Sequence, residues 1–218
     1  KIIFTLFIIA VFRLLAHVPV PGVDTSSIKA YLESSVIFGF FDLFSGGGFQ
    51  NFSIVTLGLG PYINASIIIQ LLTMLIPSLE EMAKEGEYGQ EKINMYTKVL
   101  AIPMAFVQAY GIYFLLSKQG IINSLGGFDV ILLMLTFTAG SMLLVWLGDL
   151  LTEKGVGNGI SALIFVSIIS RLPASVLSAV TGIMSSSYLQ TVIILALILL
   201  TMIMVVLVNE GTRNVLLE

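Results

Sequence analysis

The chain has 218 residues, of which 57% are hydrophobic and only 11% are charged. Soluble domains carry about a quarter charged residues, so this composition excludes a soluble globular domain and predicts a membrane protein. The net charge of −3 excludes the basic surface that binds nucleic acid, and the absence of cysteine excludes disulfides and thiolate metal sites.

Six apolar stretches follow one another along the chain, and we predict that each is a membrane-spanning helix. They cover residues 2–18, 57–76, 99–116, 130–147, 159–172 and 189–208. Prolines follow three of them, because a proline cannot continue a helix: Pro19 after the first, Pro77 after the second and Pro173 after the fifth. The fold class predicted is therefore all-α, a polytopic membrane helix bundle.

The stretch from Phe38 to Pro77 is unlike an ordinary membrane helix. An aromatic-rich piece, Phe38 to Phe44, predicts a short helix, and the three glycines of residues 45–48 break it. About twenty uncharged residues, enough for a full span, then run from Leu57 to Ile76. Broken helices at membrane depth are tolerated only where protein or a water-filled cavity surrounds them. The stretch therefore predicts a pore or a binding site.

Two connecting segments are polar. Residues 78–98 hold five glutamates and three lysines, which predicts a solvated loop, and residues 149–158 predict a tight turn. With a cytoplasmic amino terminus, the inside segments carry six lysines and arginines and the outside segments three, which favours that orientation.

Two aliphatic pairs stand directly after glycine-rich breaks: Leu59 with Ile63, and Ile160 with Ile164. The members of each pair are four residues apart and so share one helix face. Ordinary packing against lipid or other helices explains them, and so does a hydrophobic constriction that gates a pore by excluding water.

Polar residues within the spans are few. Arg13 is the one charge, for which we expect a structural salt bridge or a side chain that reaches the interface, and His17 is expected to cap the helix end. Asn64, Ser66, Gln70 and Gln108 are expected to make helix-to-helix hydrogen bonds, although Asn64 and Gln108 could instead line a polar seam. Metalloprotease, esterase and phosphate-loop motifs are missing, so we expect neither an enzyme nor a bound cofactor or metal.

Five blocks of sequence, in order along the whole chain, resemble the SecY family, the central subunit of the bacterial protein-conducting channel. They are PVPGVD at 19–24, FSGGG at 44–48, LGLGPYINASIIIQLL at 57–72, KEGEYGQEKINMYTK at 84–98 and WLGDLLTEKGVGNGIS at 146–161. The family has ten spans, so the chain resembles its first six. We expect a portion of a longer protein, since the chain starts at Lys1 and ends soon after an apolar span.

The resemblance implies roles for residues already singled out. The family's plug, a short helix that blocks the closed channel, would fall at about residues 40–51. It would include Phe40, Phe41, Leu43, Phe44, Ser45, Gly46, Gly47 and Gly48. The pore ring would include Leu59, Ile63, Ile160 and Ile164, and the lateral gate Asn64 and Gln108. Leu59 stands where many relatives have isoleucine.

The implied function is passage of unfolded secretory polypeptides across the bacterial inner membrane and sideways release of membrane segments into lipid. The implied partners are the SecE and SecG subunits, the SecA ATPase or a translating ribosome, and signal sequences. A secondary solute transporter is the alternative, but it would place polar or charged residues at the helix breaks, where this chain has aliphatic ones. An intramembrane enzyme would need an acid, base or nucleophile pair within the spans, whose interiors hold Arg13 as the one charged residue.

Overall fold

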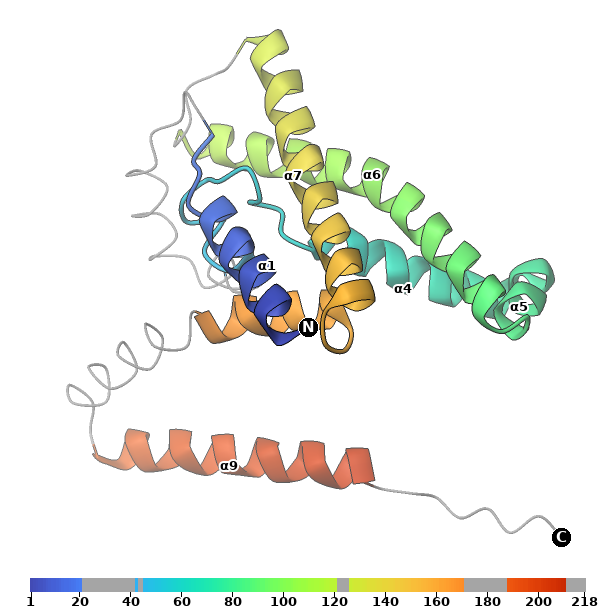
Figure 1. The fold of residues 1–218 in the computed structure, drawn as a ribbon. Coiled ribbons are helices and arrows are strands. Elements are labelled where there is room, and N and C mark those ends of the chain that lie inside the picture. The colour runs from blue at the N-terminus through green and yellow to red at the C-terminus, as the bar shows by residue number, and fades with distance from the viewer. Residues whose placement is uncertain (21–41, 43–44, 121–125, 171–187, 211–218) are drawn as a thin grey trace, which may run out of the picture. The chain divides into compact units, whose positions relative to one another are not determined.

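The computed structural model describes residues 1–20, 42, 45–120, 126–170 and 188–210 (Figure 1). They form two units. The first, Lys1–Arg171, contains α1 (Ile2–Leu15), α4 (Gly60–Leu75), α5 (Pro77–Lys84), α6 (Glu87–Lys118), α7 (Gly127–Lys154) and a helix at Gly159–Ser170. The second, Leu172–Glu218, contains α9 (Tyr188–Glu210). Apart from an isolated bridge between Pro19 and Ser53, the described residues form no β-structure, so the predicted all-α class is confirmed.

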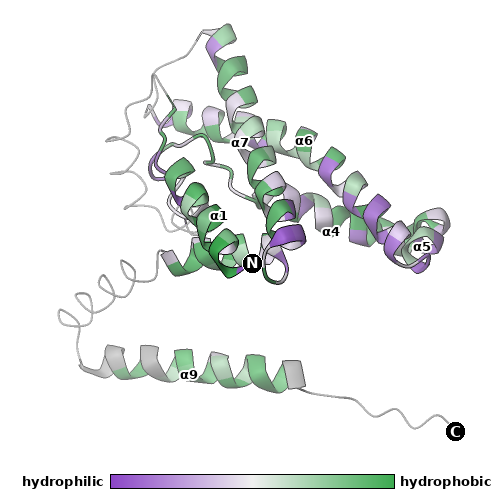
Figure 2. Ribbon diagram, viewed as in Figure 1, coloured by the Kyte–Doolittle hydropathy of each residue, from purple (hydrophilic) through white to green (hydrophobic). Residues whose placement is uncertain are grey.

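Among the helices of the described residues, two are long and apolar enough to cross a membrane (Figure 2). At 1.5 Å per residue, α6 and α7 are roughly 48 and 42 Å long, more than the roughly 30 Å hydrocarbon core. α4 and α5 qualify together, although they are bent by 103° at the break between them. The apolar helices at Ile2–Leu15, Gly159–Ser170 and Ala196–Val208 are shorter, so the six-span arrangement stays a prediction.

The prediction of a loop at residues 78–98 is wrong, because most of this segment is helical. Pro77 occupies the first turn of α5, where its missing N–H costs nothing. Lys84 Nζ lies 2.6 Å from Glu80 Oε1, one turn away, and this contact holds the pKa of the Glu80 carboxyl below its usual value. Gly86, with φ of 77°, makes the turn into α6. The high charge density therefore indicated solvent exposure, not irregular backbone.

The predicted turn at residues 149–158 is shorter than expected. α7 continues to Lys154, and the turn occupies residues 155–158. Gly157 has φ of 73°, and Asn158 Oδ1 accepts a hydrogen bond of 3.0 Å from the Ser161 N–H. Asn158 thus caps the helix that carries Ile160.

The described residues of the first unit form two apolar core clusters, and α7 contributes to both. One gathers around Phe52 and Phe137, whose ring centroids are 5.1 Å apart in an edge-on arrangement. The other gathers around Leu59, Leu144 and Leu163. α7 also contacts both α1 and α6, so it links these two helices within the unit (Figure 1).

Candidate functional site

The break predicted after Phe44 is present as a turn-rich stretch, residues 45–52, which we name the glycine segment. Gly46 and Gly47 have φ of 64° and 91°, values that only glycine adopts without strain. Ser45 Oγ accepts a hydrogen bond of 2.9 Å from the Phe49 N–H, and Asp42 Oδ1 accepts one of 2.8 Å from the Gln50 N–H. The segment is therefore an ordered turn, not a continuation of a helix.

The end of α1 holds the glycine segment from one side. Arg13 Nη1 donates a hydrogen bond of 2.7 Å to the Gly46 carbonyl, and Asn51 Nδ2 donates one of 3.1 Å to the Ala16 carbonyl. The structural role expected for Arg13 is thus present, with a backbone carbonyl as the acceptor where a salt bridge was expected. The Nδ1 of His17 lies 2.7 Å from the Arg13 carbonyl oxygen, which agrees with the expected cap.

The remaining predicted plug residues lie outside the described part of the chain. They are Phe40, Phe41, Leu43 and Phe44, and the predicted short helix at 38–44 falls there too, except for Asp42.

The two aliphatic pairs meet in one apolar cluster. Leu59 is 3% exposed and precedes the first turn of α4, where its carbonyl accepts a hydrogen bond of 3.0 Å from the Ile63 N–H. Ile63, Ile160 and Ile164 are partly buried and pack against the same cluster. Residues about a hundred positions apart in the sequence are therefore close in space, as a constriction requires and as ordinary packing also allows.

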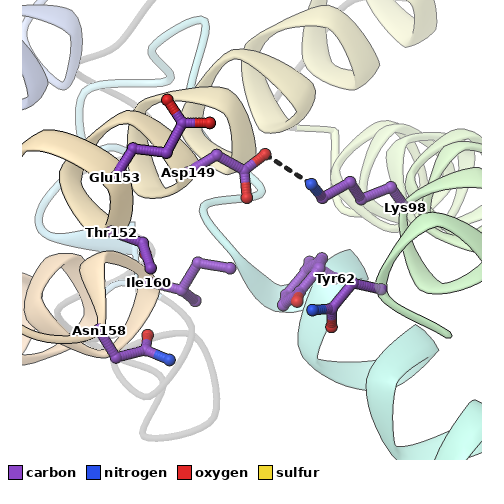
Figure 3. Close-up of a pocket in the computed structure, with 8 residues that line it drawn as sticks. Tyr62, Lys98, Asp149, Thr152, Glu153, Asn158 and Ile160 are labelled. Carbon is purple, nitrogen blue, oxygen red and sulfur yellow. Dashed lines mark ion pairs between the residues drawn. The ribbon is translucent and has the colours of Figure 1, made fainter. Parts of the chain in front are cut away.

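A polar cavity of about 270 Å³ adjoins Ile160 (Figure 3). Its lining comes from four elements: Tyr62 of α4, Asn94 and Lys98 of α6, Asp149, Thr152 and Glu153 of α7, and Asn158 and Ile160 beyond it. Lys98 Nζ lies 2.7 Å from Asp149 Oδ2, and the two side chains are 38% and 36% exposed. This mixture of both charges and amides suits a hydrated vestibule. Among the described residues, no group of three or more His, Asp or Glu is placed to hold a metal ion.

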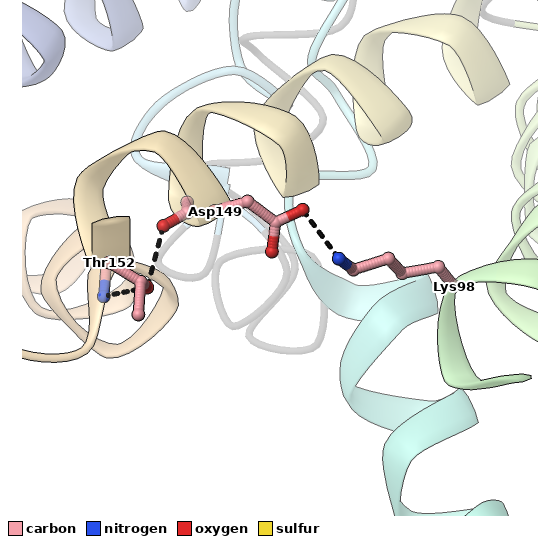
Figure 4. A network of polar contacts seen from close by, with 5 residues as sticks. Lys98, Asp149 and Thr152 are labelled. Carbon is pink, nitrogen blue, oxygen red and sulfur yellow. Dashed lines mark hydrogen bonds and ion pairs between the residues drawn. The ribbon is translucent and has the colours of Figure 1, made fainter. Parts of the chain in front are cut away.

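A second network joins α7 to the helix of Ile160 (Figure 4). Thr152 Oγ1 donates a hydrogen bond of 3.0 Å to the Gly148 carbonyl and accepts one of 2.9 Å from the Gly159 N–H. Sequence analysis missed Lys98, Asp149 and Thr152, because charged and hydroxyl residues near the ends of spans are ordinary.

One of the two predicted gate residues, Gln108, lies at the contact of α4 with α6. Gln108 is half-buried, and its Oε1 lies 3.8 Å from the point where a Cβ on Gly60 would be. Asn64 is exposed and shares a face of α4 with Gly60, four residues before it. Gln70 Nε2 donates to Ser66 Oγ at 3.4 Å within α4, so this pair bonds within one helix and not between helices as expected.

Comparison with known proteins gives consistent matches. A family model described as SecY matches residues 53–218. Protein translocase subunit SecY of Corynebacterium glutamicum is 40% identical over 228 residues, covering 99% of this chain and 51% of that protein. The subunit of the same name from Pyropia yezoensis is 42% identical over 217 residues, covering 99% and 52%. The chain thus spans about half the length of these relatives.

Two solved structures share the fold. One is described as "The structure of a protein conducting channel" and the other as "Sec61 in the Canine ribosome-channel complex from the endoplasmic reticulum". Each gives a TM-score of 0.56 at 21% identity, covering 78% of this chain and 36% of the other.

Proposed function

This chain belongs to the SecY family, given the family match over residues 53–218 and 40% identity to a relative along 99% of its length, and we propose that it forms the first six spans of a protein-conducting channel. The channel passes unfolded secretory polypeptides across the membrane and releases transmembrane segments sideways into lipid. The chain hydrolyses nothing and needs no cofactor, since conduction requires only a path and a seal.

The observation that carries the proposal is the meeting of Leu59, Ile63, Ile160 and Ile164 in one cluster beside a polar cavity. We name these four residues the constriction. Apolar side chains on separate helices can close around a moving polypeptide of any sequence, because they make no specific hydrogen bonds, and they exclude water and ions at rest. The polar cavity beside Ile160 would supply a hydrated approach to this seal.

The glycine segment belongs to the plug, at about residues 40–51, which occupies the path on the other side of the constriction in the closed channel. Its ties to Arg13 and Ala16 support a held, resting position. Asn64 and Gln108 line this half of the lateral gate, and the rest of the gate comes from spans beyond this chain.

The protein lies in the bacterial inner membrane with its amino terminus in the cytoplasm. The close approach of Gly155 to Thr5 brings the end of α7 to the start of α1, so Lys1 and Lys154 belong to one side. The excess of positive charge on that side supports a cytoplasmic location. The partners are SecE, SecG, signal sequences, and either the SecA ATPase or a translating ribosome.

Reconstitution tests the proposal. The full-length protein is placed in vesicles with SecE and SecG, and SecA, ATP and a secretory precursor are added. We expect protease-protected precursor that depends on the signal sequence, with a precursor lacking that sequence as the control. Vesicles that protect no precursor yet accumulate a small solute would instead support a transporter, for which no structural observation argues.

A further inference from the structure

One side of α7 receives the backbone that leads into the constriction. Gly140 lies so close to the Ile54 carbonyl that any Cβ there would collide with it. Ser141, whose side chain is fully buried, donates a hydrogen bond of 3.0 Å from Oγ to the Gly58 carbonyl. Residues 54–58, which lead directly to Leu59, therefore rest on α7 by contact and by hydrogen bond.

The same helix receives the other half of the constriction two turns later. A Cβ on Gly148 would lie 2.7 Å from Ile160 Cγ1 and 3.4 Å from the Ile160 Cα and N atoms. Gly159 in turn packs against the Gly148 carbonyl. The first turn of the helix at Gly159–Ser170 is thus seated where α7 has no side chain.

The two contact sites on α7, at Gly140 and at Gly148, lie a fixed distance apart. Gly140, Leu144 and Gly148 are spaced by four residues, so they follow one face of the helix over a rise of about 12 Å. Leu144 is 1% exposed and packs in the cluster that contains Leu59 and Leu163. Both halves of the constriction are therefore positioned by contacts with the same regular helix, α7.

We propose that Ser141 and Gly148 of α7 are positioning residues of the constriction. Ser141 holds the backbone that leads to Leu59, and Gly148, which has no side chain, leaves the space that the Ile160 side chain occupies. This inference rests on the proposed function. Isoleucine has few accessible χ1 rotamers, so a methyl group at position 148 forces the Ile160 side chain into another rotamer. That change moves the end of the Ile160 side chain relative to the other three residues of the constriction. The contacts with the Ile160 backbone are of ordinary length and need no shift.

The test measures the ion conductance of the resting full-length channel, with SecE and SecG, in planar bilayers without precursor. We compare Gly148→Ala, Ile160→Ala and the double variant with wild type. Gly111→Ala is the matched control, since Gly111 lies within α6 and a Cβ there meets nothing within 4 Å. We expect Gly148→Ala to raise the fraction of time spent conducting by roughly tenfold, and Gly111→Ala to change nothing.

The double variant separates positioning from general damage to packing. Once Ile160 is alanine, the Cγ1 atom is gone, so adding Gly148→Ala should leave the conductance within about twofold of that of Ile160→Ala alone. An equal increase in both backgrounds would overturn the proposal, as would a wild-type conductance for Gly148→Ala. If Ile160→Ala itself stays sealed, the constriction is wrong and the proposed function loses its main support.

If Gly148→Ala does not assemble, Ser141→Ala carries the same test with Leu59→Ala in place of Ile160→Ala. Loss of the hydrogen bond to Gly58 should raise conductance by about fivefold in the wild-type background and add nothing once Leu59 is alanine. An effect of equal size in both backgrounds, or none in either, overturns the proposal.

Discussion

Replacing Arg13 by methionine should make the channel easier to open. The guanidinium donates a hydrogen bond of 2.7 Å to the Gly46 carbonyl and is only partly buried. A hydrogen bond from a charged donor is worth about 1.5–3 kcal/mol, and the lower end applies to a partly exposed one. Losing about 1.5 kcal/mol from the resting position raises the displaced population of the glycine segment about tenfold.

The assay compares export of a precursor with a weakened signal sequence and of the same precursor with an intact one. A signal sequence opens the channel only by binding the open state more tightly than the closed state. A channel that opens more easily therefore needs a smaller difference in affinity and accepts a weakened signal sequence. We expect export of the weakened precursor to rise about tenfold in Arg13→Met and less in Arg13→Lys, whose ammonium can still donate a hydrogen bond. His17→Ala is the control, because the ring is exposed and its hydrogen bond is to the Arg13 backbone carbonyl. Wild-type export of the weakened precursor by a normally abundant Arg13→Met channel would refute the reasoning.

Three further predictions concern stability. Phe137 is fully buried against a second aromatic ring, so Phe137→Ala should cost about 3–5 kcal/mol and lower the melting temperature of the detergent-solubilised complex, whereas an unchanged melting temperature would contradict the described core. The side chains of Lys98 and Asp149 are each more than a third exposed, so a double-mutant cycle with Lys98→Met and Asp149→Asn should give a coupling free energy below about 1 kcal/mol that shrinks in high salt. A coupling free energy several times larger would contradict the solvent exposure of this ion pair. The lowered pKa of Glu80 means that its contact with Lys84 stabilises α5 at neutral pH and is lost as the pH falls through that lowered pKa. The protection of the α5 amides against hydrogen exchange, measured relative to their intrinsic exchange rates at each pH, should therefore fall in acid, and Glu80→Gln should remove this dependence.

Features with a local sequence signal were predicted well. The break at residues 45–48 and the helix end at Pro77 each follow from the backbone chemistry of glycine and proline. The two aliphatic pairs were identified because each follows a glycine-rich break. Their meeting in one cluster needed the structure, since they are separated by about a hundred residues.

Features that depend on a distant partner were not predicted. The acceptor for Arg13 is a backbone carbonyl, which every residue has, so no residue type identifies it. Glycines at 140 and 148 are visible in the sequence, but nothing there says that Ile54 and Ile160 approach them. The charge of residues 78–98 predicts solvent exposure and does not distinguish a loop from an exposed helix, which has the same composition.

The most direct test of the constriction places a photocrosslinking amino acid in the full-length protein at Leu59, Ile63, Ile160 or Ile164 during arrested export of a secretory polypeptide. A control site is Leu197 in α9. We predict that the four positions crosslink to the mature part of the passing polypeptide and that Leu197 does not. Crosslinks from the four positions to lipid or neighbouring helices alone would contradict the account, and the two pairs would then be ordinary packing residues.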